Sequence, residues 1–300
     1  MRLLSFRQGS AEGVAVKTGD GEYRGYTALD PRFPGSLERL IAGGHETLVS
    51  AASRLRSGNL VDLDRVAILP PLRKPEKIIC VGLNYADHTA ESGFAKPDYP
   101  VIFARFSSSL VGHGGAIVRP RVSVQLDFEG ELAAVVGTGG RCIPRSAALE
   151  HICAYSVFND ASVRDFQSRT PQWTLGKNFD GTGAFGPELV TADELPPGCV
   201  GLRLQTRLNG VVMQNASTAD MIFDVATLVA EISEAITLSP GDVIVTGTPS
   251  GVGLARRPPV WMKAGDVCEV EIEGVGRLSN PIAEESMHHG KAPDSTIGAV

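Results

Sequence analysis

Residues 125–136 read Gln-Leu-Asp-Phe-Glu-Gly-Glu-Leu-Ala-Ala-Val-Val, and this segment decides the fold we expect. Apolar residues bound it and its polar residues alternate, which predicts a β-strand. Because side chains alternate between the two faces of a strand, Asp127, Glu129 and Glu131 are expected on one face. Carboxylates this close repel one another, and either raised pKa values or a hard cation with oxygen ligands relieves that repulsion. The alternative is a solvated face on an edge strand.

The composition is that of an ordinary globular protein with a sizeable core, since 43% of the residues are hydrophobic and 21% are charged. The net charge of -6 argues against nucleic acid or an anionic membrane as the main partner. No apolar run approaches the ~20 residues that cross a bilayer, and no signal peptide is expected. The scattered cysteines form no C-x-x-C pair and are typical of reduced thiols. We therefore expect a cytoplasmic protein.

The chain is expected to fold as two domains followed by a tail. Residues 1–72 predict a small α/β domain, which ends in a Pro-rich stretch that we interpret as a linker. Residues 73–282 predict the larger, catalytic domain. Residues 283–300 are polar and small, which is typical of a loosely ordered tail.

Three further segments carry clear local signals. Helical spacing of apolar residues predicts a helix over 36–54, with Ser36 as its N-cap, and a second helix over 218–238. Asn209-Gly210 lies between two strand-like runs and predicts a β-hairpin over 202–214.

Two sets of polar residues outside the carboxylate segment are candidates for catalysis. If residues 85–92 form a helical turn, His88 and Glu91 lie on one face, where a carboxylate can fix the tautomer of the imidazole. The alternative is an ordinary surface ion pair. Lys177 is the one cation of a Gly-rich stretch over 173–187 that lacks the pattern of a phosphate-binding loop, so nucleotide binding is not expected. The alternative for Lys177 is a solvated surface lysine.

Together these segments resemble the fumarylacetoacetate hydrolase family, which includes acylpyruvate hydrolases and 2-hydroxyhepta-2,4-diene-1,7-dioate isomerases. The resemblance covers roughly residues 75–282, and it is specific because five motifs occur in the family's order. They are Gly82-x-Asn84-Tyr85-x-x-His88-x-x-Glu91, Asp127-Phe128-Glu129-Gly130-Glu131-Leu132, Phe158-Asn159-Asp160, Gly176-Lys177-Asn178-Phe179-Asp180 and Thr246-Gly247-Thr248-Pro249-x-Gly251-Val252-Gly253.

The resemblance implies an α+β, mostly β fold: a mixed β-sandwich roll with a small N-terminal α/β domain. It also implies a homodimer that binds Mg²⁺, with Mn²⁺ and Ca²⁺ as alternatives. The residues that match the family's sites are Glu129, Glu131 and Asp160 for the metal, His88, Glu91 and Lys177 for catalysis, with the first two on a lid, and Thr248 in the loop that meets the substrate carboxylate. Arg105 and Gln214 are further candidates for binding the substrate. Asp127 is not a ligand in this pattern and is expected to support the strand or a contact behind the ligands.

The activity that the resemblance implies is hydrolysis of a C–C bond in an acylpyruvate-type 2-oxo acid. The substrate's carboxylate and 2-oxo oxygens bind the metal, which acts as a Lewis acid and stabilises an enolate. His88, held by Glu91, takes a proton from water and directs it at a carbonyl two carbons away. The pyruvate enolate then leaves with its charge on the metal and Lys177.

Three other interpretations of the function stay open. The same machinery serves an isomerase or tautomerase when the enolate is reprotonated elsewhere, and an oxaloacetate decarboxylase when CO₂ leaves. A third alternative is a member that has lost catalysis and only binds a metal or a partner, against which the intact site residues argue.

One departure from the family bears on the substrate. Many members have Lys-Pro after a Phe-Thr pair, whereas this chain has Phe103-Ala104-Arg105-Phe106. An arginine grips a carboxylate with two hydrogen bonds, which a lysine cannot do. Phe106 would line the pocket, and we expect an aromatic or cyclic degradation product as the substrate.

Overall fold

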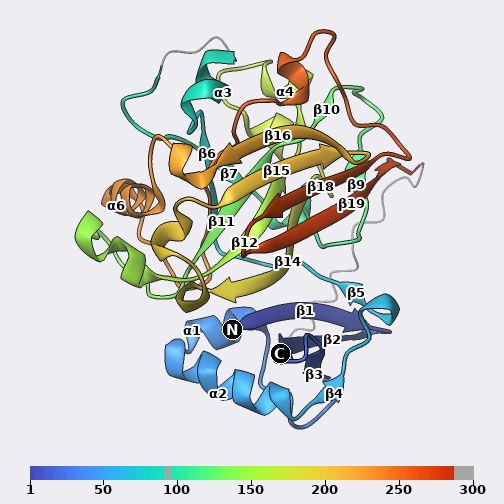
Figure 1. Cartoon of the computed structure of the whole chain (residues 1–300), viewed down its shortest axis with the longest axis vertical. Helices are drawn as coiled ribbons and strands as arrows, with labels where there is room; N and C mark the ends of the chain where they lie inside the picture. The colour runs from blue at the N-terminus through green and yellow to red at the C-terminus, as the bar shows by residue number, and fades with distance from the viewer. Residues whose placement is uncertain (92–95, 287–300) are drawn as a thin grey trace, which may run out of the picture.

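The computed structural model describes residues 1–91 and 96–286 and is mostly β (Figure 1). A large mixed sheet lies behind a second, five-stranded sheet, and short helices lie around their edges. Buried apolar side chains of both sheets, among them Leu132, Leu204 and Val270, belong to one core cluster. The mixed β-sandwich roll is therefore confirmed.

The large sheet runs through both parts of the chain. Along its hydrogen-bonded order its strands are β4 Asn59–Leu60, β3 Tyr23–Thr27, β2 Ala11–Lys17, β1 Arg2–Gln8, β14 Gly183–Thr191, β12 Ile152–Asp160, β11 Gly130–Val136, β17 Val243–Val245, β6 Ile78–Gly82 and β7 Val101–Arg105, with β5 Ala67–Ile68 beside β1 and β8 Leu110–Val111 beside β14.

The second sheet contains the predicted hairpin. Its strands in order are β16 Val211–Ser217, β15 Arg203–Leu208, β18 Val267–Ile272, β19 Gly276–Glu284 and β9 Ile117–Arg119, and a separate pair is formed by β10 Leu126–Asp127 and β13 Ser162–Val163. Asn209 and Gly210 have φ of 52° and 78°, the left-handed values that a tight hairpin turn requires. The hairpin is confirmed.

The helices are short. They are α1 Leu37–Ala42, α2 His45–Arg56, α3 Ala86–Glu91, α4 Arg164–Gln167, α5 Thr174–Lys177 and α6 Val225–Ala235. The 3₁₀ turns are η1 Leu63–Arg65, η2 Ser107–Ser109, η3 Arg145–His151, η4 Ala192–Glu194, η5 Pro197–Cys199, η6 Thr218–Asp220 and η7 Gly253–Ala255. No helix in the described ranges is both long enough and apolar enough to cross a membrane.

Neither predicted helix forms as one continuous helix over its whole range. The helix over 36–54 begins after Ser36, which caps it as expected, but breaks at Gly43-Gly44, where Gly44 has a φ of 83°. The helix over 218–238 begins only after Asp224, whose carboxylate accepts a hydrogen bond from the Thr227 amide. In both cases a local cap or turn overrides the apolar spacing.

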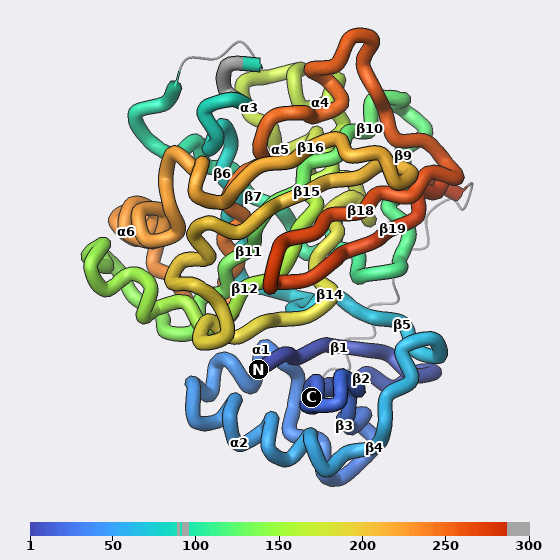
Figure 2. Tube along the Cα trace, viewed as in Figure 1, coloured from blue at the N-terminus to red at the C-terminus, as the bar shows by residue number. Residues whose placement is uncertain are grey.

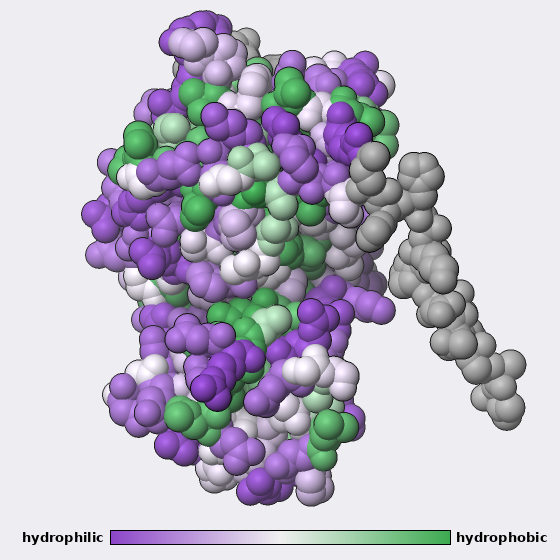
Figure 3. All heavy atoms as spheres, turned by 90° about the vertical axis from the view of Figure 1, so that its right-hand side faces the viewer, coloured by the Kyte–Doolittle hydropathy of each residue, from purple (hydrophilic) through white to green (hydrophobic). Residues whose placement is uncertain are grey.

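The N-terminal part is the lower body in Figures 1 and 2. Its strand β1 pairs with β14, Arg2 opposite Val190, so the large sheet is continuous across the predicted boundary. Figure 3 shows apolar surface at the waist between the two bodies. Whether residues 1–72 are an independent domain stays a prediction.

Two predicted boundaries shift. The strand over 125–136 is interrupted at Phe128-Glu129: β10 pairs with β13, and β11 joins the large sheet. At the other end, β19 continues through Glu284, so residues 283 and 284 belong to a strand, while residues 287–300 of the predicted tail lie outside the described ranges.

Candidate metal centre and active site

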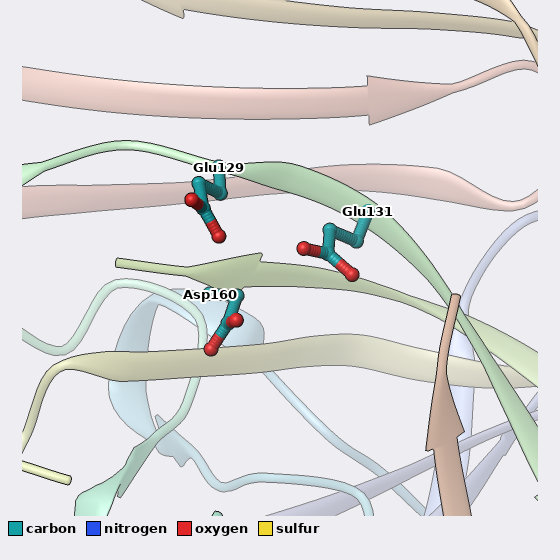
Figure 4. A group of neighbouring side chains, drawn as sticks. All are labelled: Glu129, Glu131 and Asp160. Atoms are coloured by element: carbon teal, nitrogen blue, oxygen red, sulfur yellow. The ribbon is translucent and has the colours of Figure 1, made fainter. Parts of the chain in front are cut away.

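Three carboxylates meet where two neighbouring strands come together. Glu129 precedes β11, Glu131 lies in it, and Asp160 ends β12, its antiparallel neighbour. One oxygen of each lies within 4.8 Å of the others, and all three side chains are buried (Figure 4). The Asn159 amide oxygen accepts a hydrogen bond from the Glu129 backbone N–H at 3.0 Å and so fixes the approach to β11. The structure therefore brings the three predicted metal ligands together.

Three buried cations compensate part of this negative charge. Lys177 Nζ lies 2.5 Å from Glu129 Oε2 and 2.7 Å from Asp160 Oδ2. Arg164 Nη1 lies 2.6 Å from Glu129 Oε1, and Arg105 pairs with Asp160. Lys177 is 2% exposed, so it is not a solvated surface lysine. Although burial raises the pKa of Glu129, Lys177 and Arg164 outweigh it and lower that pKa to about 2.

Glu131 lacks such compensation. Its Oε2 accepts a hydrogen bond from the Gly247 backbone N–H at 2.5 Å, but no cation pairs with it within the described part of the chain. Burial, together with Asp160 and Glu129, raises its pKa well above the ordinary value. An uncompensated buried carboxylate among oxygen donors suits a hard divalent ion such as Mg²⁺, Mn²⁺ or Ca²⁺. The residues present therefore fit a bound metal.

Asp127 supports this cluster from behind. Its carboxylate accepts hydrogen bonds from the Gly253 and Leu254 backbone N–H groups at 2.7 and 2.9 Å, and from Arg164 Nε at 2.8 Å. Because Arg164 also pairs with Glu129, Asp127 holds a residue that contacts a candidate ligand. Arg164 was not predicted as a site residue, because the only sequence feature that links it to the site is its position four residues after Asp160.

Replacing Asp127 with alanine is expected to lower the free energy of unfolding by about 3–5 kcal/mol, because Arg164 would stay buried with one partner fewer. Urea denaturation followed by circular dichroism measures this change. Asp98→Ala removes an exposed carboxylate and is the matched control. Equal midpoints for the two variants would contradict the supporting role of Asp127.

The predicted dyad forms on α3. His88 Nδ1 lies 3.0 Å from Glu91 Oε1, and both Glu91 oxygens accept the Gly251 backbone N–H at 3.0 Å. Burial raises the pKa of Glu91, but the hydrogen bonds from His88 and Gly251 outweigh it and lower that pKa overall. His88 is buried, and its Nδ1 contact with Glu91 leaves Nε2 for proton transfer.

The three predicted substrate-binding residues are already engaged with protein atoms. Arg105 is buried and donates to Asp160, Ser109 Oγ, Thr182 Oγ1 and the Ala161 carbonyl. The guanidinium is thus held against a candidate metal ligand, and the role of Arg105 in binding substrate stays a prediction.

Gln214 and Thr248 also form hydrogen bonds with other residues of the chain. The Gln214 amide accepts from the Gly130 N–H at 3.0 Å and donates to Thr248 Oγ1 and the Pro249 carbonyl, both at 2.8 Å. Thr248 Oγ1 donates to the Gly130 carbonyl at 3.0 Å. Gln214 is 1% exposed, and its hydrogen bonds join the 246–253 loop to β11, while its role as a substrate contact stays a prediction. The role of Thr248 stays a prediction.

The chain is similar to known proteins in sequence and in structure. The family model "Fumarylacetoacetate (FAA) hydrolase C-terminal" matches residues 77–283. The chain is 40% identical to the mitochondrial oxaloacetate tautomerase fahd2 of Xenopus laevis over 290 residues, 94% of this chain and 90% of that protein. A fumarylacetoacetate hydrolase from Exiguobacterium antarcticum superposes with a TM-score of 0.82 at 38% identity, covering 95% of this chain and 100% of that one.

A further solved relative carries a metal. The maleylpyruvate hydrolase from Sphingobium, in complex with manganese(II) and pyruvate, superposes with a TM-score of 0.78 at 27% identity, covering 95% of this chain and 100% of that one. With a family model over most of the chain and a relative aligned over almost its whole length, this chain belongs to the fumarylacetoacetate hydrolase family.

Proposed function

We propose that this protein is a metal-dependent tautomerase that interconverts the keto and enol forms of a four-carbon 2-oxo dicarboxylate such as oxaloacetate. The observation that carries the proposal is the buried Glu129–Glu131–Asp160 cluster, with Lys177 against it, in a chain 40% identical to an oxaloacetate tautomerase. This moves the tautomerase, an alternative in the sequence interpretation, ahead of acylpyruvate hydrolysis.

The side chains present suit that reaction. Glu129, Glu131 and Asp160 would hold a divalent ion, which supplies a Lewis acid for the 2-oxo and carboxylate oxygens of the substrate. His88 takes a proton from C3 at Nε2 and returns it there in the reverse direction, while Glu91 keeps the imidazole oriented. As the C3–H bond breaks, the 2-oxo oxygen becomes an enolate oxygen, which then takes a proton from solvent to give the enol, while the proton on His88 passes to solvent. The Lys177 ammonium offsets the negative charge that develops on that oxygen.

Hydrolysis of an acylpyruvate is the second candidate, and the dyad favours it. A histidine whose Nδ1 is held by an anchored glutamate can also activate water, which a tautomerase does not need. In that reaction the water attacks the distal carbonyl, the C–C bond breaks, and pyruvate leaves as its enol.

The products distinguish the candidates. We expect proton NMR in D₂O with Mg²⁺ to show fast exchange of the C3 protons of oxaloacetate, with no pyruvate beyond that formed without protein. Formation of acetate and pyruvate from acetylpyruvate would establish hydrolysis instead. Formation of pyruvate from oxaloacetate above the protein-free rate would establish a decarboxylase. If both substrates behave as they do without protein, the proposal is wrong.

Three further properties stay predictions. The metal is proposed to be Mg²⁺, with Mn²⁺ and Ca²⁺ as alternatives to compare by titration calorimetry. The homodimer implied by the resemblance is testable by light scattering. Localisation in the cytoplasm is likewise open, since the name of the Xenopus laevis relative places that protein in mitochondria.

A further inference from the structure

Trp173 stands at the start of the turn that carries Lys177. It directly precedes α5, and its backbone carbonyl accepts a hydrogen bond from the Lys177 N–H at 3.2 Å. Its side chain is half-buried, although neither the metal cluster nor the dyad includes it. A large aromatic ring therefore lies next to the turn that carries Lys177 without belonging to the proposed catalytic or metal-binding residues.

The indole packs against Gly82, the last residue of β6. A Cβ added at Gly82 would overlap Cζ3 of the ring and would lie 2.7 Å from Cη2. Gly82 is not among the glycines with positive φ, so the indole, and not the backbone conformation, disfavours a side chain there. The residues that follow Gly82 lead directly into α3, which carries His88 and Glu91.

The indole also contacts Phe103, which lies on β7, the strand paired with β6. The two rings meet edge to face, with centroids 5.5 Å apart and an interplanar angle of 65°. The Phe103 ring in turn lies under the Lys177 ammonium, whose Nζ is 4.9 Å from its centroid. Edge-to-face rings and a cation over a ring are both directional contacts, so the position of the indole constrains the position of the ammonium.

We infer that Trp173 is a positioning residue that couples the dyad segment, Gly82 to Glu91, to the turn carrying Lys177. The rigid indole contacts Gly82, where the dyad segment begins, and Phe103, the ring beneath Lys177. A shift of the dyad segment therefore displaces the Lys177 ammonium, and a shift of the ammonium displaces the dyad segment. The inference rests on the roles proposed above for His88 and Lys177. Proton transfer by His88 and charge compensation by Lys177 would then both depend on the position of Trp173.

The activity test uses two substitutions and their combination. Trp173→Ala is expected to lower kcat between about 10- and 100-fold, the scale of a small misplacement of reacting groups, with a smaller effect on KM. Trp173→Phe keeps an aromatic ring and should restore most of kcat. Gly82→Ala should lower kcat in the native background but not in Trp173→Ala, where the overlapping ring is gone. Additive losses, or an unchanged kcat in Trp173→Ala, would overturn the inference.

A spectroscopic test leaves Trp173 in place. The chain has two tryptophans, so Trp261→Phe makes Trp173 the only indole. We expect its emission and its quenching by acrylamide to change when oxalate, an unreactive mimic of a 2-oxo acid, is added with MgCl₂. The change should be smaller after Glu91→Gln, which weakens the anchor of α3 on Gly251. Unchanged emission and quenching, under conditions where oxalate raises the melting temperature, would also overturn the inference.

Failure of the inference is distinguishable from failure of the proposed function. A Trp173 signal that responds to oxalate in a protein inactive on oxaloacetate supports the coupling and refutes the tautomerase. Turnover of oxaloacetate that Trp173→Ala and Gly82→Ala leave unchanged supports the tautomerase and refutes the coupling.

Discussion

Glu131→Gln is expected to abolish metal binding and turnover together, while making the metal-free protein more stable. Glu131 is 2% exposed and has no cationic partner among the described residues. An ionised carboxylate in that position is costly until a divalent ion compensates it. Glutamine keeps the size of the side chain and can still accept the Gly247 N–H, but it carries no charge and is a poor ligand for Mg²⁺.

The pH dependence follows from the raised pKa of Glu131. Burial and the neighbouring carboxylates raise that pKa above its ordinary value of 4.5, so the folded protein holds this proton at pH values where the unfolded chain has released it. Unfolding then releases a proton, and this group's contribution to stability falls as the pH rises above about 4.5. Metal binding needs the ionised carboxylate, so the metal affinity of the wild type should rise over the same range.

Melting temperatures, measured over a range of pH in EDTA and in MgCl₂, report the stability of the protein without and with the metal. Calorimetric titration with MgCl₂ over the same range of pH reports the metal affinity. At a metal concentration 100 times its Kd the wild type should gain about 2.7 kcal/mol of stability, and Glu131→Gln should gain none. Glu46→Gln neutralises an exposed glutamate on α2 and should behave as the wild type. An unchanged affinity of Glu131→Gln for Mg²⁺ would remove Glu131 from the metal site.

His88→Asn is expected to lower kcat by about 10²- to 10⁴-fold and to leave metal affinity unchanged. The imidazole is held at 3.0 Å by Glu91, whose carboxylate is itself fixed by the Gly251 N–H. Asparagine is of similar size and can still bond Glu91, but it has no group that takes and returns a proton near neutral pH. The substitution therefore separates proton transfer from metal binding.

Steady-state kinetics and metal titration on the same preparation provide this test. His45→Asn replaces an exposed histidine at the start of α2 and serves as the matched control. Full activity in His88→Asn would show that the dyad is not catalytic. A lost metal affinity would instead make His88 part of the metal site.

The carboxylate cluster was predictable from the sequence because its residues are close along the chain or belong to recognisable motifs. Alternation in residues 125–136 placed Glu129 and Glu131 on one face, and the family resemblance added Asp160. The break between β10 and β11 was not predictable, because it depends on Asp127 accepting the backbone N–H groups of Gly253 and Leu254, far away in the sequence. Local alternation carries no information about such a contact.

The cations were harder to assign than the carboxylates. Arg105 was expected to meet the substrate, yet it pairs with Asp160, and Arg164, which pairs with Glu129, was not expected at the site. A sequence shows that an arginine is near a motif, but not which carboxylate its long side chain reaches. The burial of Lys177 was not predictable for the same reason, because it depends on tertiary packing that brings α5 to the carboxylate cluster.

The most direct test of the account is the rate at which the protein interconverts enol and keto oxaloacetate in one sample, first with Mg²⁺, then after EDTA, and then with Mg²⁺ restored. Protein-free samples with the same additions give the background rate. A protein-dependent rate that disappears in EDTA and returns with Mg²⁺ is the predicted result. A protein-dependent rate that persists unchanged in EDTA would contradict a catalytic metal at Glu129, Glu131 and Asp160.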